Sequence, residues 1–222
     1  MASREIERSK RKESHDLKRK RAHLSTSPTI LIVCEGENTE VSYLHKLKFR
    51  SATIEPVGEG FNTISLVERA EFLASEKKYD EVWCVFDRDD FPAHNFNNAI
   101  WKAESKGFNV AYSNQAFEYW IILHFSNHQG GAMDRNQYGI QINRLLRPFD
   151  LHYDHEGAKD ISDELFNLLF SIDPIYGKSR SQLAIERSKI IYGRFDHSSP
   201  ATEESSTTMH LLVEHLMEFQ RY

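Results

Sequence analysis

Apolar runs and amphipathic segments alternate along the first half of the chain. Residues 29–34 and 81–86 are continuous apolar runs rich in β-branched and aromatic residues, which is typical of strands covered on both faces. The segments that follow them carry apolar residues at helical spacing and are bounded by Gly, Pro or Asn. The pattern predicts strands at 29–34, 53–57, 81–86 and 108–112, and helices that begin near residues 38, 62 and 93.

The order of these elements predicts an α/β fold with a mostly parallel central sheet, because strands that alternate with helices are joined by crossover connections. Pro56 places the strand at 53–57 near an edge of that sheet, since proline cannot donate to a ladder. Residues 117–125 form a helical segment that is apolar almost all round, and we expect it to be deeply buried. Ser113 or Asn114 is expected to cap it.

The second half of the chain is more polar and contains more loops. Residues 126–160 are predicted to be an insertion with short helices around 138–146. Later helices are predicted at 162–170, 180–195 and 207–219, with a Ser/Pro/Glu-rich connector at 198–206. We therefore expect an α/β core at 28–125 and a mainly helical C-terminal region at 126–222 that packs on it.

Positive charge is concentrated at one end of the chain. The 222 residues include 28 Lys and Arg against 33 Asp and Glu, a net charge of −5 that is not typical of a classical DNA-binding domain. Residues 1–27 are nevertheless rich in Lys and Arg and lack apolar periodicity, which predicts a basic, flexible arm. The arm could be a solubilising tail, or it could contact the phosphate backbone of a nucleic acid.

Two cysteines and the absence of long apolar runs indicate the cellular compartment. Cys34 and Cys84 lie inside predicted strands and are read as small buried residues in a reducing environment, although they could be neighbours across the sheet with a redox role. No apolar run reaches the length of a membrane span, and the basic N-terminus lacks the apolar centre of a signal peptide. We expect a soluble, cytoplasmic protein with no membrane partner.

Acidic residues follow two of the predicted strands directly. Glu35 ends the first apolar run, and Asp87 and Asp89 follow the run at 81–86. The carboxyl ends of parallel strands share one sheet edge, where ligands bind in open α/β folds. Carboxylates that converge there predict a site for a hard cation such as Mg²⁺. Two other interpretations remain: Glu35 could cap a helix or pair with Arg88, and the whole cluster could be a salt-bridged structural feature.

The other acidic residues of the first cluster receive structural interpretations. Glu37 is predicted to lie in a turn, and Glu40 in the first turn of a helix, where it complements the helix dipole. Glu118 interrupts an otherwise apolar helix and must be paired, hydrogen-bonded or directed at a site. Lys178 lies in a Gly/Ser-rich turn before a helix; it could stabilise phosphoryl charge, or it could be a solvated surface lysine.

Three histidines are read as structural. His124 is predicted to be a core histidine with a satisfied hydrogen bond. His152 and His155, in a polar loop without further ligands at known spacing, are read as solvated rather than metal-binding.

Five short motifs in this order resemble the RloB family. They are Glu35-Gly-Glu-x-Thr-Glu40, Asp87-x-Asp89, Phe117-Glu118-x-Trp120, Tyr176-x-Lys178 and Thr207-Thr208-x-His210. The resemblance runs from about residue 29 to the end of the chain. It implies a Toprim-like three-layer domain in which Glu35 is the acid of the first strand and Asp87 and Asp89 bind Mg²⁺. It also implies a role in prokaryotic anti-phage or restriction-associated systems, often beside an AAA-type ATPase called RloA.

The leading hypothesis from the sequence is a Mg²⁺-dependent nuclease that cuts DNA or RNA, with tRNA among the candidate substrates. Glu35, Lys178 and Glu118 are the predicted catalytic residues, and Asp87, Asp89 and Glu35 the predicted metal ligands, with Mn²⁺ able to replace Mg²⁺. The alternative is a non-catalytic sensor or regulatory subunit that binds a metal or nucleotide and acts with a partner ATPase.

Overall fold

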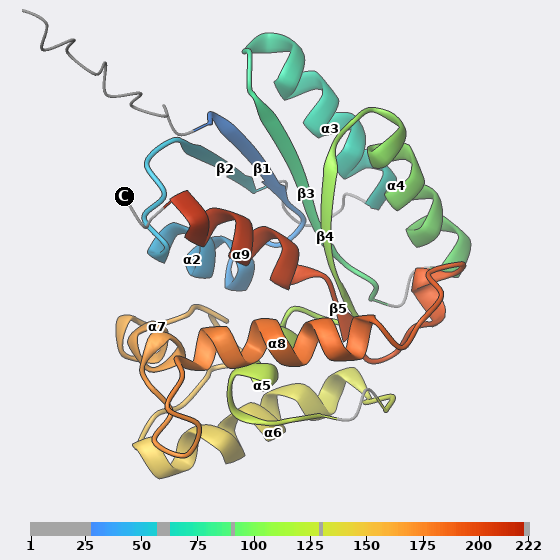
Figure 1. Cartoon of the computed structure of the whole chain (residues 1–222). Coiled ribbons are helices and arrows are strands. Elements are labelled where there is room, and N and C mark those ends of the chain that lie inside the picture. The colour runs from blue at the N-terminus through green and yellow to red at the C-terminus, as the bar shows by residue number, and fades with distance from the viewer. Residues whose placement is uncertain (1–27, 57–62, 90–91, 129–130, 220–222) are drawn as a thin grey trace, which may run out of the picture.

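The computed structural model describes residues 28–56, 63–89, 92–128 and 131–219 (Figure 1). The basic arm at 1–27 lies outside these residues. The strands are β1 (Ile30–Cys34), β2 (Ala52–Pro56), β3 (Glu81–Asp87), β4 (Asn109–Asn114) and β5 (Ser206–Thr207). The helices are α2 (Thr39–Lys46), α3 (Thr63–Glu76), α4 (Ala93–Ser105), α5 (Glu118–Phe125), α6 (Arg135–Leu146), α7 (Asp163–Phe170), α8 (Arg180–Tyr192) and α9 (Met209–Phe219), with short 3₁₀ turns η1 (Arg147–Phe149) and η2 (Pro200–Thr202).

The five strands form one sheet in the order β2-β1-β3-β4-β5. The first four are parallel, and β5 pairs with β4 in the antiparallel sense. The α/β class and the mostly parallel sheet are therefore confirmed, and β2 is an edge strand as Pro56 predicts. The prediction missed β5, because two residues are too short to show a strand pattern.

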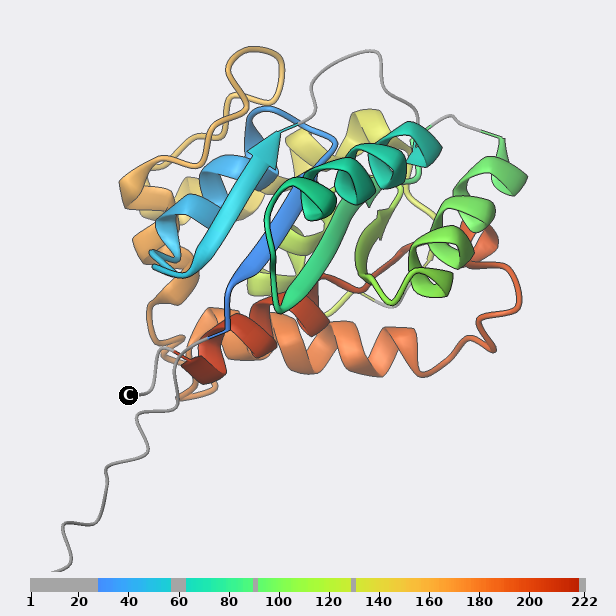
Figure 2. The ribbon, with the colours of Figure 1, turned by 90° about the horizontal axis from the view of Figure 1, so that it is seen from above.

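Alternating residues of the buried strands supply two hydrophobic layers, one on each face of the sheet. Leu31 and Val33 of β1 pack with α3 and α4. Ile30 and Ile32 point the other way and pack with α2, α5 and the C-terminal helices. The views along and across the sheet show this arrangement (Figures 1 and 2). The result is the three-layer, Toprim-like α/β architecture with added C-terminal helices.

The C-terminal region is continuous with the core on one face of the sheet. Trp120 of α5, Leu169 of α7 and Met209 of α9 lie in one buried cluster, which confirms that α5 is deeply buried. Residues 126–222 also supply β5, so the sheet itself draws on both predicted regions. The predicted caps of α5 are wrong: Ser113 and Asn114 belong to β4, whose last residues continue the ladder with β5.

The two cysteines are free and fully buried, as small core residues are. Cys34 is in register with Val85, and Cys84 with Val33. The two thiols belong to the hydrophobic layers on opposite faces of the sheet, so they do not face each other across it. Within the ranges that the structure describes, no helix has the length and apolar composition needed to cross a bilayer.

Candidate functional site

β1 and β3 bring two of the predicted acidic residues together. The backbone N–H of Glu35 donates to the carbonyl of Val85 at 2.9 Å, which extends the β1–β3 ladder to the end of β1. The N–H of Asp87 donates to Glu35 Oε2 at 3.2 Å. Parallel strands of similar length thus place both carboxylates at one sheet edge.

The carboxylate of Asp87 lies against the start of α5. Its Oδ2 accepts a hydrogen bond from the N–H of Phe117 at 3.0 Å, in the position where a helix N-terminus favours negative charge. Burial, together with the charges of Glu40 and Glu118, nevertheless raises the pKa of Asp87 well above its usual value. Asp87 is thus a carboxylate whose charge the surrounding protein compensates only in part.

Asp89 lies in the turn after β3 with a left-handed backbone, φ 42°, which aspartate adopts more readily than most residues. Its carboxylate forms an ion pair with Arg135. Arg88 points elsewhere and donates through Nη1 to the backbone carbonyl of Asp89 at 2.7 Å. The interpretation in which Arg88 neutralises Glu35 therefore receives no support from the contacts of Arg88.

Glu40 belongs to the site, although the sequence interpretation made it only a helix start. It does lie in the first turn of α2, but it is 7% exposed and lines the same pocket as Glu35 and Asp87. Burial and repulsion from Glu118 raise the pKa of Glu40 to about 7. The one indication of this in the sequence is that Glu40 belongs to the acidic run that begins at Glu35.

Glu118 is directed into the site and is held by a hydrogen-bond network. The hydroxyl of Tyr153 donates to Glu118 Oε1 at 2.9 Å and lies 3.0 Å from Thr39 Oγ1. Thr39 Oγ1 in turn donates to the backbone carbonyl of Lys159 at 2.7 Å. The network ties α2, α5 and the segment at 151–161 together around the pocket.

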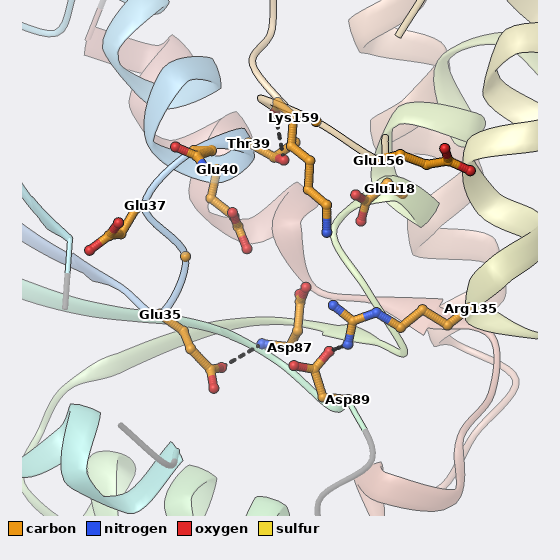
Figure 3. A pocket seen from close by; sticks show the side chains of 13 residues that line it. Glu35, Glu37, Thr39, Glu40, Asp87, Asp89, Glu118, Arg135, Glu156 and Lys159 are labelled. Atoms are coloured by element: carbon orange, nitrogen blue, oxygen red, sulfur yellow. Dashed lines mark hydrogen bonds and ion pairs between the residues drawn. The ribbon is translucent and has the colours of Figure 1, made fainter. Parts of the chain in front are cut away.

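These residues enclose a pocket of about 500 Å³ at the carboxyl end of the sheet (Figure 3). Seven acidic side chains line it against two basic ones, so its lining is predominantly acidic. The acidic residues are Glu35, Glu37, Glu40, Asp87, Asp89, Glu118 and Glu156, and the basic residues are Arg135 and Lys159.

The cations of the pocket differ from the one that the sequence suggested. Lys178 does not line it; its ammonium pairs with Glu186 of α8 at 2.7 Å. Arg135 and Lys159 come instead from the region at 126–160, which was read as a polar insertion. No pattern in that region ties a particular Lys or Arg to the sheet edge, because only the folded chain brings them together.

The donor set suits a hard divalent cation, but its carboxylates now face other partners. Among the described ranges, no three His, Cys, Asp or Glu side chains stand at distances that would hold a metal. Burial and repulsion from Glu40 raise the pKa of Glu35 to about 7, although its hydrogen bond with Asp87 opposes the shift. Crowded carboxylates with raised pKa values are the environment that a hard cation stabilises, and Glu35, Asp87 and Asp89 remain the predicted ligands.

The histidines behave as structural residues. His124 is fully buried, its Nδ1 lies 2.9 Å from the carbonyl of Trp120, and burial lowers its pKa to about 3. This confirms the prediction of a core histidine with a hydrogen bond. His152 is exposed, and His155 Nδ1 lies 3.4 Å from Asn143 Nδ2.

The family model of RloB-like protein matches residues 30–216, from the first residue of β1 to the buried Leu216 of α9. The chain belongs to the RloB-like family. No curated protein and no solved structure matches it. The RloB-like match therefore covers the sheet, the acidic pocket and the C-terminal helices, and it leaves the activity of the pocket to be inferred from its chemistry.

Proposed function

We propose that this RloB-like protein is a Mg²⁺-dependent nuclease that hydrolyses phosphodiester bonds of DNA or RNA. The observation that carries the proposal is the meeting of Glu35, Asp87 and Asp89, from two parallel strands, in one pocket that also holds Arg135 and Lys159. Carboxylates for a metal and cations for a phosphate are the two components that such a reaction needs.

Each residue has a defined task in this reaction. A bound Mg²⁺ would polarise the phosphate and lower the pKa of an attacking water. Glu35, with a pKa of about 7, is suited to accept the proton of that water or to share the metal. Lys159 stands next to Glu40 and Glu118, and its ammonium can neutralise charge that develops on the phosphoryl oxygens.

The cellular role is part of the same proposal. A nuclease of this family would act in a prokaryotic anti-phage or restriction-associated system, in the cytoplasm, with an AAA-type ATPase as partner. The basic arm at 1–27 would add affinity for nucleic acid that weakens with salt.

The test is a cleavage assay on plasmid DNA, single-stranded DNA, tRNA and other RNA, with Mg²⁺, with and without the partner ATPase. Cleavage should disappear with EDTA and in Asp87→Asn, whose amide oxygen can still accept from Phe117 and so preserve the fold. Asp163→Asn, at an exposed carboxylate paired with Lys46, is the matched control and should cut normally. Cleavage that survives both EDTA and Asp87→Asn would contradict the metal assignment.

A second candidate is a sensor or regulatory subunit that binds a metal and a nucleotide without cutting. The size of the pocket, about 500 Å³, favours this candidate because it suits one small ligand. A groove of basic residues leading to Asp87 would favour the nuclease, but the candidates for it, Lys46, Lys48, Arg50 and Lys178, do not line the pocket. Lys46 pairs with Asp163, and Lys178 with Glu186. Metal-dependent binding of a nucleotide, with no cleavage of any substrate in the panel, would select this function.

A further inference from the structure

Arg135 stands at a position that a helix by itself disfavours for a cation. It is the first residue of α6, directly after the N-cap Asp134, whose side chain accepts from the N–H of Asn136 at 2.9 Å. The N-terminus of a helix carries a partial positive charge, so an arginine there is repelled by the helix dipole. Besides the N-cap carboxylate of Asp134, a second source of negative charge offsets this repulsion.

That source is the acidic pocket. The guanidinium of Arg135 forms an ion pair with Asp89 and lines the same pocket as Glu35 and Glu40. Arg135 is therefore the counter-ion of Asp89 within the acidic pocket (Figure 3). In this arrangement it supplies the charge that a divalent cation would supply.

The ion pair and a metal compete for the same carboxylate. An oxygen of Asp89 that is paired with a guanidinium is not free to coordinate a cation, and the nearby positive charge also repels that cation. The side chain of Arg135 is 41% exposed, so it has room to leave the pair toward solvent. Lys159 has less freedom to move than Arg135, because Thr39 donates a hydrogen bond to its backbone carbonyl.

We propose that Arg135 is a counter-ion that the divalent metal displaces from Asp89, and that the released guanidinium then binds a phosphate of the nucleic acid. This inference rests on the proposed function for the identity of the phosphate ligand. A planar guanidinium is well matched to two phosphate oxygens. Metal binding thus comes first, and phosphate binding follows it.

The first test measures metal affinity without nucleic acid, by titration calorimetry with Mn²⁺ and Mg²⁺. Arg135→Gln should bind the metal about threefold to tenfold more tightly than the wild type, because the competitor is gone. Arg144→Gln removes the same charge from an exposed position of the same helix and should bind like the wild type. Unchanged or weaker binding in Arg135→Gln, or no metal binding by any variant, would overturn the exchange.

The second test follows the arginine directly. The side-chain N–H resonance that is lost in Arg135→Gln identifies Arg135 in the NMR spectrum, and saturating Mg²⁺ alone should shift it. A resonance that stays in place at saturation would mean that the ion pair with Asp89 persists, and the proposal would fail.

The phosphate step is tested with labelled DNA and RNA oligonucleotides in Ca²⁺, which occupies such sites without supporting cleavage in many nucleases. Ca²⁺ should raise the affinity of the wild type for at least one oligonucleotide, and Arg135→Gln should lose most of that gain, while Arg144→Gln keeps it. If the wild type binds neither oligonucleotide, or if Arg135→Gln keeps the full gain, the phosphate step is wrong. All three tests could give the expected results while no substrate is cleaved. That outcome would reject the nuclease activity but would support the displacement of Arg135 from Asp89 by the metal.

Discussion

The carboxylate of Glu40 occupies the space that a side chain at position 36 would need. A Cβ atom placed on Gly36 would meet Oε2 of Glu40 and come within 3.0 Å of its Cδ. Glu40 is 7% exposed and lines the pocket, so a shift of its carboxylate would change the lining of the pocket. The glycine directly after Glu35 therefore leaves room for the carboxylate of Glu40 in the pocket.

Gly36→Ala should reduce metal affinity by about tenfold while leaving the free energy of unfolding within about 1 kcal/mol of the wild type, because the group that must move is the end of one side chain. Calorimetry and chemical denaturation measure the two quantities. Gly131→Ala is the control, since a Cβ at that position meets no atom within 4 Å. A large loss of stability with unchanged metal affinity would show that Gly36 has a purely structural role.

The stability of the metal-free protein should depend on pH through Glu35 and Glu40. Folding raises the pKa of each from 4.5 to about 7, so the folded protein holds more protons than the unfolded chain in this window. The free energy of unfolding is therefore highest below pH 4.5 for these groups and falls as the pH rises to about 7.

In Glu40→Gln the free energy of unfolding should fall less between pH 4.5 and pH 7. Near neutral pH it should exceed that of the wild type by about 1–3 kcal/mol. Denaturation at a series of pH values in EDTA measures it, with Glu214→Gln, at an exposed pair with Lys189, as the control. Addition of Mg²⁺ should reduce the difference in free energy of unfolding between Glu40→Gln and the wild type. An advantage that is the same at pH 4 and pH 7 would show that the carboxylate of Glu40 is not strained by its neighbours.

Two substitutions should show which lysine stabilises the phosphoryl charge during cleavage: Lys159→Gln and Lys178→Gln. Loss of the pocket ammonium of Lys159 should lower the cleavage rate by about tenfold to a hundredfold. Loss of Lys178, whose partner is Glu186, should leave the rate near that of the wild type. Single-turnover cleavage measures both, and a larger defect in Lys178→Gln would restore the assignment that the sequence suggested.

Tyr153→Phe should loosen the segment that carries Lys159. The variant loses the hydrogen bond to Glu118 and the contact with Thr39, at a cost of about 1 kcal/mol in the free energy of unfolding. At temperatures where the variant remains folded, this loss of stability does not lower the amount of active protein. The cleavage rate should nevertheless fall, because Lys159 is held less firmly. Tyr176→Phe, at an exposed tyrosine, is the control and should alter neither quantity.

Local pattern was sufficient for the strands that carry the acids. The runs at 29–34 and 81–86 are apolar on both faces, and such runs can be satisfied only in the middle of a covered sheet. Helices between them require parallel pairing, so the positions of Glu35 and Asp87 at one edge follow from the chain alone. Local sequence pattern was also sufficient to predict the α/β class, the edge position of β2 and the burial of α5.

Tertiary packing decided the rest of the pocket. Glu40 has the ordinary sequence signature of a helix start, and only the closeness of α2 to α5 buries it beside Glu118. Arg135 lies 46 residues from Asp89 along the chain, and Lys159 lies 119 residues from Glu40. β5 pairs with β4 across 92 residues, between Asn114 and Ser206. Periodicity records which face of an element is apolar, but it carries no information about which distant side chain will meet it. The sequence by itself thus determined the sheet and its acidic edge, while the cations that balance that edge were decided by the fold.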